Sequence, residues 1–381
     1  MKFIQLTNSA SLILLISTGL LSGCGGGGGS STQKSNSVVT NGYSNHILVS
    51  DGAVAADHVD KNLLNPWGIA FEQSGPVWVA NNKSQTSTLY DGNGAAQSLL
   101  VTIPSGKNGP SNPTGVVLNV SQDFLLTSGT TSAPAQFIFD GEGGTISGWS
   151  PNTGNTTIIT YDDGAGGAVY KGLALSSVGG SNFLYAADFH NNKIDVFNSH
   201  FVKMTTSSHF FDPNIPSGYA PFGIQNIQGN LIVTYAKQMA PENHDEVVGT
   251  GLGYIDLFDS AGNLLKRIAS AGVLNAPWGV ALAPGNFGQF SNDLLIGNLG
   301  DGRINAFSMT DGQFMGTLSL TDGSPISTGG LWGIAFGNGV DNQPTNTLFY
   351  DGGINHGSDG VYGRIDAVAM TTQSSGNSSG Y

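Results

Sequence analysis

The stretch NPWGIAF, Asn65 to Phe71, sets a pattern that the rest of this sequence repeats. A glycine inside a short apolar run recurs five more times, as NPTGVVL around Gly115, VYKGLAL around Gly172, APFGIQN around Gly223, APWGVAL around Gly279 and GLWGIAF around Gly333. Successive glycines lie 47 to 57 residues apart. A repeat of this length that contains several short strands is typical of the blades of a β-propeller.

Each repeat continues with further strand-like runs. A second apolar run ends in a polar residue, and a third run, such as GYIDLFD, alternates apolar and polar residues as a half-buried strand does. A fourth run, such as QSLLVTI, completes most repeats. We therefore predict an all-β, six-bladed β-propeller with four-stranded antiparallel blades over residues 43–369.

The two ends of the repeat region differ in a way that predicts how the ring closes. The last repeat stops after GRIDAVA without a fourth apolar run, whereas an unpaired strand-like piece, NHILVSD from Asn45 to Asp51, precedes the first repeat. Pairing of this N-terminal strand with the last blade would leave neither sheet edge bare. We expect this closure.

Composition agrees with such a fold and excludes one class of partner. The 381 residues include 57 glycines, which disfavour long helices and suit short strands with many turns. Thirteen basic against 26 acidic residues give a formal net charge of −13. Nucleic-acid binding needs a face rich in lysine and arginine, so we predict no nucleic-acid partner. We expect a monomer.

The N-terminus predicts export and lipid anchoring. Residues 1–23 combine Lys2 with the apolar run ASLILLISTGLL, as in a signal peptide. LSGC, from Leu21 to Cys24, resembles the lipobox of bacterial lipoproteins, which implies that Cys24, the only cysteine, carries the lipid. By analogy with Gram-negative sorting, Gly25 favours the outer membrane. Residues 24–42 then form a flexible Gly/Ser linker and residues 370–381 a disordered tail. An ordinary secretory signal followed by an unmodified cysteine is the alternative.

Several motifs together carry a resemblance to a known family. From HILVSD through NPWGIAF, GPVWVANN, LYAADFHNNKIDVF and DLLIGNLGDGRINAF to GLWGIAFGNG, the chain resembles a family of uncharacterised bacterial exported β-propellers, some with PEP-CTERM sorting tails. That family is similar to NHL-repeat propellers. The resemblance covers about residues 43–369 and implies the fold and an extracytoplasmic location, but it implies no activity.

Polar residues at the ends of corresponding strands are the candidate ligand-binding site. In a propeller these ends lie on one face, so we expect a ring of side chains at the mouth of the channel, joined by His190 from an adjoining loop. The ring comprises Asn81, Asp140, Asp188, Asn298 and Asp351. Their oxygens suit Ca²⁺ or Mg²⁺, with Asp140, Asp188 and Asp351 as the candidate metal ligands. Alternatively, Asn and Asp simply form turns at strand ends.

Two other features have both a structural and a functional interpretation. Trp67, Trp278 and Trp332 precede three of the repeated glycines, where they would pack between blades or offer a ligand-stacking surface. The fourth repeat contains an insertion, KQMAPENHDEVVGTG from Lys237 to Gly251, with His244 and several acids. Such a loop can carry function or be a flexible excursion.

These observations leave three kinds of function open. The first is a lipid-anchored extracytoplasmic scaffold in the cell envelope that binds a partner protein, glycan or small ligand. The second is a metal-dependent, lactonase-like hydrolase with one divalent ion at the channel mouth. The third is a structural component of the cell surface. The sequence has no zinc-protease HExxH motif and no P-loop, so it identifies no catalytic residues.

Overall fold

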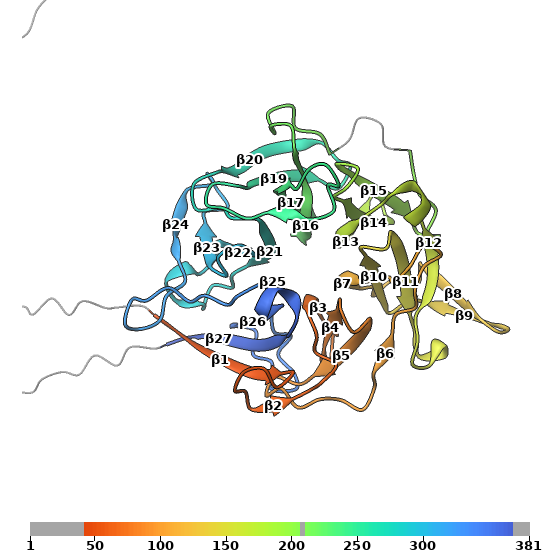
Figure 1. Cartoon of the computed structure of the whole chain (residues 1–381), viewed down its shortest axis with the longest axis horizontal. Coiled ribbons are helices and arrows are strands. Elements are labelled where there is room, and N and C mark those ends of the chain that lie inside the picture. Colours follow the sequence, from red (N-terminus) through yellow and green to blue (C-terminus); the bar gives the residue numbers. More distant parts are fainter. Residues whose placement is uncertain (1–41, 206–209, 369–381) are drawn as a thin grey trace, which may run out of the picture. The chain divides into compact units, whose positions relative to one another are not determined.

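The computed structural model describes residues 42–205 and 210–368, which form six β-sheets arranged as blades around an axis (Figure 1). From the axis outward, the first blade consists of β3 (Pro66–Phe71), β4 (Val77–Asn81), β5 (Thr86–Tyr90) and β6 (Val101–Thr102). The second blade consists of β7 (Pro113–Leu118), β10 (Phe137–Gly141), β11 (Thr145–Trp149) and β12 (Ile158–Asp162). The third blade consists of β13 (Tyr170–Val178), β14 (Ser181–Asp188) and β15 (Lys193–Asn198). A hairpin of β8 (Leu125–Ser128) and β9 (Thr131–Pro134) projects from the second blade.

The other three blades follow the same plan. The fourth blade consists of β16 (Tyr219–Ile227), β17 (Asn230–Gln238), β19 (Tyr254–Asp259) and β20 (Leu264–Ser270). The fifth blade consists of β21 (Pro277–Leu282), β22 (Leu294–Asn298), β23 (Ile304–Phe307) and β24 (Phe314–Thr317). The sixth blade consists of β25 (Leu331–Phe336), β26 (Thr347–Gly352), β27 (Val361–Ala367) and β1 (Tyr43–Ser50). Two-residue strands β18 (Glu246–Val247) and β2 (His58–Val59) pair with β17 and β1. The helices are short: η1 (Pro151–Thr153), η2 (Gly164–Gly166), η3 (Gly288–Phe290) and α1 (Ile354–Gly357).

The predicted closure of the ring is confirmed. β1 pairs antiparallel with β27, with Ile47 opposite Gly363 and Val49 opposite Tyr362. The N-terminal strand therefore supplies the outer strand of the last blade, and the ring needs both ends of the propeller region to close. The predicted signal peptide, the linker as far as Asn41 and the tail lie outside the described residues.

The third blade differs from the prediction of four strands per blade. Among the described residues it has three strands, and only a short stub runs beside β15, where Phe197 bridges Lys203. Lys203 is drawn toward two carboxylates, with its Nζ 2.9 Å from Asp163 and 2.8 Å from Asp195. The pair with Asp195 holds the stub to β15 of its own blade, and the pair with Asp163 links it to the second blade, in place of a continuous fourth strand.

The six repeated glycines allow neighbouring blades to touch at the axis. A Cβ built on Gly68 would lie 2.5 Å from the Thr114 carbonyl oxygen of the next inner strand, and one built on Gly223 would lie 2.2 Å from that of Trp278. Gly115, Gly172, Gly279 and Gly333 meet the backbone of the following inner strand in the same way, at 2.4 to 3.0 Å. Because Gly333 contacts Trp67, the series of contacts runs around the whole ring.

Hydrophobic clusters fill the spaces between blades. Leu126, Ile138 and Leu184, for example, belong to one cluster between the second and third blades, and each other pair of neighbouring blades has its own cluster. A seventh cluster at the axis contains Trp67 and Trp332. Blade-to-blade packing is therefore the main source of stability, since no single blade buries both of its faces alone.

Tyr43 ties the closing strand to the fifth blade, which yields a first prediction. Its buried hydroxyl donates to the Phe287 carbonyl oxygen at 2.9 Å. We expect Tyr43→Phe to lower the free energy of unfolding by about 0.5–1.5 kcal/mol in urea titrations, because a buried acceptor loses its donor. The control is Tyr362→Phe, because the buried Tyr362 hydroxyl has no partner among the described residues. Equal losses of unfolding free energy in the two variants would show that the hydrogen bond from Tyr43 to Phe287 does not stabilise the closure of the ring.

Candidate functional site

Two of the predicted ring residues cap backbone groups inside their own blades. Each inner strand has a register irregularity at its repeated glycine, which frees a backbone N–H from the sheet ladder. The Gly115 N–H donates to Asp140 Oδ1 at 2.6 Å, and the Gly333 N–H donates to Asp351 Oδ1 at 2.7 Å. Both aspartates are buried, at 1% and 0% exposure. A structural role thus accounts for their position at the strand ends.

The remaining ring residues also bond locally. Asn81 donates to Thr86 and Thr88 of the next strand, and Asn298 accepts from the Asn275 backbone N–H. Asp188 accepts from the Val169 N–H and lies 3.0 Å from the Lys193 ammonium. His190 contacts the Glu242 carbonyl oxygen at 2.9 Å. The contacts of the ring residues are therefore local, whereas His190 reaches the neighbouring blade, and metal or ligand binding by these residues stays a prediction.

The burial of Asp140 gives a prediction about pH. Desolvation raises the pKa of Asp140 to about 7, although hydrogen bonds from Thr114 and Gly115 act in the opposite direction. The folded state then holds a proton that the unfolded chain releases above its ordinary pKa of 3.8, so this group lowers stability as pH rises from about 4 to about 7. Urea unfolding of Asp140→Asn should depend less on pH across this window than that of wild type. The exposed-loop variant Asp322→Asn should follow wild type, and an unchanged slope in Asp140→Asn would contradict the prediction.

The three tryptophans pack on one another at the axis. Trp67 and Trp332 stack with ring centroids 3.5 Å apart, and Trp278 meets them edge-on at 6.2 and 5.7 Å. Trp67 and Trp332 are each 4% exposed, so their faces are largely covered. A narrow cavity of about 40 Å³, lined by Trp278 and four of the repeated glycines, also lies at the axis. These contacts favour the packing interpretation, and the three indoles obstruct the channel.

A larger pocket of about 660 Å³ lies at the tryptophan cluster. Its lining comes from loops and strands of all six blades and includes Asn65, Trp67, Glu142, Lys171, His244, Asp245, Glu246, Leu299, Gly329, Trp332, Asn355 and His356. Pockets of about 300–1,000 Å³ with a few convergent polar groups are the usual form of a small-molecule site. This pocket is the candidate functional site.

Lys171 is the central charge of the pocket. Its side chain is 1% exposed, and its Nζ lies 2.6 Å from Glu142 Oε1, 3.8 Å from Glu246 Oε2 and 3.9 Å from Asp245 Oδ1. The ammonium also lies 5.0 Å from the centre of the Trp67 ring, within range of a cation–π interaction. A buried lysine surrounded by three carboxylates is unusual, because burial without partners would strongly disfavour its charge.

The electrostatic effects within this group oppose one another. Burial alone would lower the pKa of Lys171, but the charges of Glu142 and Glu246 outweigh it and raise this pKa. Burial likewise favours a higher pKa for Glu142, yet the Lys171 charge and hydrogen bonds from Lys171 and Asn82 hold it below its usual value. In Glu246 burial dominates and raises the pKa. Lys171 and Glu142 therefore form a charged pair, with Glu246 as the more readily protonated neighbour.

The arrangement fits a divalent metal poorly. Glu142, His244 and Asp245 offer ligand atoms within 4.8 Å of one another. However, both Glu142 oxygens already accept hydrogen bonds, from Lys171 at 2.6 Å and from Asn82 at 2.9 Å, and Asp245 Oδ1 contacts His244 Nδ1 at 2.8 Å. A metal would have to displace these partners and bind beside the Lys171 ammonium group. The carboxylates of this group are therefore better suited to pair with Lys171 than to bind a divalent metal.

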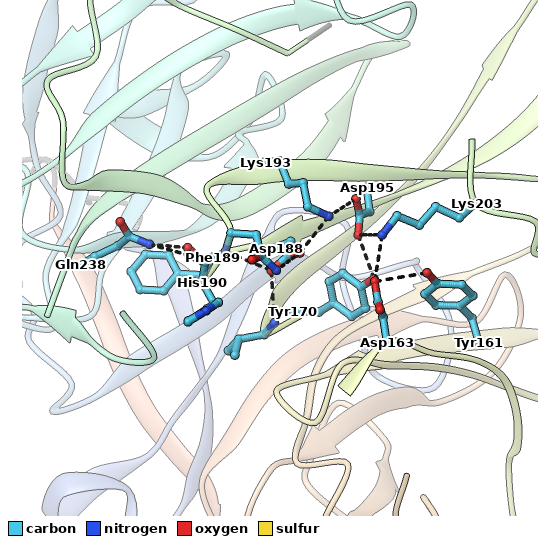
Figure 2. A network of polar contacts seen from close by, with 12 residues as sticks. Tyr161, Asp163, Tyr170, Asp188, Phe189, His190, Lys193, Asp195, Lys203 and Gln238 are labelled. Carbon is cyan, nitrogen blue, oxygen red and sulfur yellow. Dashed lines mark hydrogen bonds and ion pairs between the residues drawn. The ribbon is translucent and has the colours of Figure 1, made fainter. Parts of the chain in front are cut away.

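A strap formed by residues 239–248 brings His244, Asp245 and Glu246 to the pocket. It is anchored by β18, in which Glu246 pairs with Gln238, and by the contact of His190 with Glu242. Gln238 Nε2 donates to the carbonyl oxygens of Phe189, at 2.6 Å, and His190, at 3.2 Å (Figure 2). The base of the strap is thus fixed to the third blade.

A polar network positions the strand that carries Lys171 (Figure 2). The hydroxyl of Tyr170 donates to Asp195 Oδ2 at 3.0 Å, and Asp195 is held in turn by Lys193 and Lys203. The Lys171 carbonyl oxygen accepts from Trp278 Nε1 at 2.6 Å, across the axis. The backbone of Lys171 is therefore fixed from both sides, and its ammonium is delivered to the three carboxylates.

Comparison with known proteins places the chain among relatives of similar length. It is 33% identical over 358 residues to "Uncharacterized protein R648" of Acanthamoeba polyphaga mimivirus, which covers 92% of this chain and 86% of that protein. The chain belongs to the same family. "Uncharacterized protein L690" of the same virus, another member, is 33% identical over 295 residues, covering 76% of this chain and 77% of that protein. No family model matches the sequence.

Solved structures share the fold of this family without close sequence similarity. A protein of unknown function from Bacteroides thetaiotaomicron aligns with a TM-score of 0.54 at 12% identity, over 86% of this chain and 76% of that one. A glucose dehydrogenase aligns with a TM-score of 0.51 at 12% identity, over 86% of this chain and all of the other. These similarities support the propeller fold alone. Among the described residues, no helix combines the length and apolar character needed to span a membrane.

Sequence reasoning singled out the insertion that brings His244, Asp245 and Glu246 to the pocket, but it did not single out Lys171 or Glu142, although a signal for Lys171 was present. The residue before each repeated glycine is Trp67, Thr114, Lys171, Phe222, Trp278 or Trp332 in turn. Lysine is the only charged residue in this series. Because all six equivalent positions lie on innermost strands, a charge there must be buried near the axis and requires partners. Glu142 carries no comparable signal, whereas Glu246 lies in the insertion from Lys237 to Gly251 that the sequence marked as a candidate functional loop.

Proposed function

We propose that this chain is a lipid-anchored protein of the cell envelope whose propeller binds a small polar ligand in the axial pocket. The observation that carries the proposal is the convergence of Lys171, Glu142 and Glu246 from three different blades in a pocket with an aromatic floor. Charged groups buried at such a position are costly, and sites with perturbed pKa values in a pocket are candidates for function.

The lipobox and the bacterial exported propellers that the sequence resembles support the proposed location, with the outer membrane as the favoured site. In the axial pocket, the poor fit of Glu142, His244 and Asp245 to a divalent metal favours ligand binding. A metal-dependent hydrolase that uses Asp140, Asp188 and Asp351 is the alternative. A monomeric propeller on a flexible linker would present the pocket at a distance from the bilayer.

Blocking the pocket tests the binding proposal. A Cβ added at Gly329 meets no atom within 4 Å, and Gly329 lines the pocket, so we expect Gly329→Trp to occupy the pocket while the fold is kept. Purified wild-type protein exposed to the small-molecule fraction of an envelope extract should gain a bound mass in native mass spectrometry, whereas Gly329→Trp should gain none. No added mass on wild type, or the same mass on both proteins, would overturn the proposal.

Replacing Cys24 tests the proposed anchor. Cys24 is the only cysteine, so Cys24→Ser should abolish incorporation of labelled palmitate. Ser30→Ala in the same linker serves as the control and should behave like wild type. A Cys24→Ser protein that still incorporates palmitate would contradict lipid anchoring through this residue.

A further inference from the structure

We infer that the ligand of the axial pocket is a small neutral polyhydroxylated molecule, a mono- or disaccharide. This inference rests on the proposed binding function and names its ligand class. It follows from three properties of the described residues around the pocket: the charges are compensated within the protein, an unpartnered donor and an unpartnered acceptor stand in its wall, and the rim consists of groups that both donate and accept.

The charged groups are largely neutralised by one another. The Lys171 ammonium is paired with Glu142 at 2.6 Å, and His244 contacts Asp245 at 2.8 Å, which raises the pKa of His244. Glu246 is the carboxyl group left over, and burial raises its pKa. A strongly charged ligand would therefore disturb pairs that already exist, whereas a neutral ligand leaves them intact.

Two polar atoms of opposite kind in the wall lack partners. Trp67 Nε1 donates no hydrogen bond and Glu246 Oε2 accepts none, since the Lys171 ammonium lies 3.8 Å from Glu246 Oε2, and both atoms are shielded from bulk water. Native proteins rarely leave buried polar atoms unpaired, so each of them calls for a partner. A hydroxyl group of a bound ligand can serve either atom once the side chains that cover it shift, because a hydroxyl both donates and accepts. An ammonium ligand could serve only Glu246, and a carboxylate ligand only Trp67.

The rim has the same dual character. Asn65, Asn355 and His356 line the pocket with amide and imidazole groups, each of which can donate and accept. All three hold left-handed backbone conformations, with φ of 47°, 54° and 57°. Such conformations cost energy in residues other than glycine and are concentrated at functional sites. They place several two-way hydrogen-bonding groups around one opening, as a ring of hydroxyls requires.

The aromatic floor sets an expectation for affinity. Trp67 and Trp332 cover each other's faces and are each 4% exposed, so a sugar ring would meet their edges and gain little from stacking. Hydrogen bonds, which must replace those of the sugar with water, would then supply most of the affinity. We expect a dissociation constant of about 0.1 to 1 mM for a well-fitting saccharide.

Calorimetric titration with probes of three classes tests the inference. The probes are neutral saccharides (methyl glucoside, N-acetylglucosamine and cellobiose), amines (ethanolamine and spermidine) and carboxylates (lactate and citrate). We expect at least one saccharide to bind wild type, and Glu246→Gln to weaken that binding about 10-fold, as for loss of a hydrogen bond to a charged or strongly polar group. Glu242→Gln, in an exposed part of the same strap, should bind like wild type.

Each outcome separates this inference from the proposed function. Binding of amines or carboxylates alone would overturn the saccharide inference and leave the binding function standing. An adduct from envelope extract without binding of any saccharide probe would do the same. Saccharide binding that survives both Gly329→Trp and Glu246→Gln would overturn the inference by locating the saccharide elsewhere. Absence of both adduct and probe binding would overturn the proposed function as well.

Discussion

Replacing Gly223 with alanine should destabilise the propeller by at least about 3 kcal/mol, the upper end of the usual cost of overpacking. The new Cβ would lie 2.2 Å from the Trp278 carbonyl oxygen and 2.8 Å from Thr234 Oγ1. The closer atom belongs to the backbone of the neighbouring inner strand, so no side-chain rotation relieves the clash. The fourth and fifth blades would have to separate, which opens the packed cluster between them.

Urea unfolding of a graded set of variants measures this effect. Gly172→Ala, whose Cβ would lie 3.0 Å from the Phe222 carbonyl oxygen, should lose much less stability. Gly329→Ala meets no atom within 4 Å and should unfold like wild type. Because Gly223 and Gly329 have no left-handed φ, the comparison isolates steric contact from backbone strain. Equal stability of the Gly223→Ala and Gly329→Ala proteins would mean that the axial contacts do not set the packing of the ring.

The same contacts explain why the architecture could be predicted from the sequence. Each inner strand contacts the next one through a glycine. A glycine is therefore required once per blade, and its spacing along the sequence gives the repeat length and the number of blades. The N-terminal strand was predictable for a related reason, since Ile47 and Val49 had no partner in the first repeat and the last repeat lacked an outer strand. Requirements that repeat along the chain, or that leave an edge unpaired, are visible in one sequence.

The pocket depends on relationships that do not repeat. Glu142 follows β10, Lys171 lies on β13 and Glu246 lies on a strap beyond β17, so their meeting depends on how three blades are oriented. The predicted ring residues illustrate the opposite case. Asp140 and Asp351 recur at equivalent positions because each caps a backbone N–H within its own blade. Polar residues that recur at the strand ends therefore indicate a structural requirement of each blade. The single lysine among the residues that precede the repeated glycines indicates the position of the pocket.

Replacing Lys171 with methionine should cost about 3–5 kcal/mol, the usual cost of removing one partner from a buried ion pair. Methionine keeps much of the side-chain volume but removes the positive charge that faces Glu142 and Glu246. The carboxylates would then be buried without compensation beside the tryptophan cluster. Loss of stability should grow as pH rises, because ionised carboxylates gain most from the ammonium. Urea unfolding at acidic and neutral pH would measure both effects.

A charge-removing second substitution distinguishes this explanation from simple loss of packing. In the double variant Lys171→Met with Glu142→Gln, the carboxylate nearest to the lysine is neutralised while Glu246 remains, so part of the lost stability should return. Lys107→Met, at an exposed position, controls for the general effect of losing a lysine. If the double variant is as unstable as Lys171→Met at every pH, the lysine contributes through its shape and not through its charge, and the electrostatic account of the pocket fails. Recovery of stability in the double variant would instead support the role of Lys171 as an internal cation that compensates the buried carboxylates.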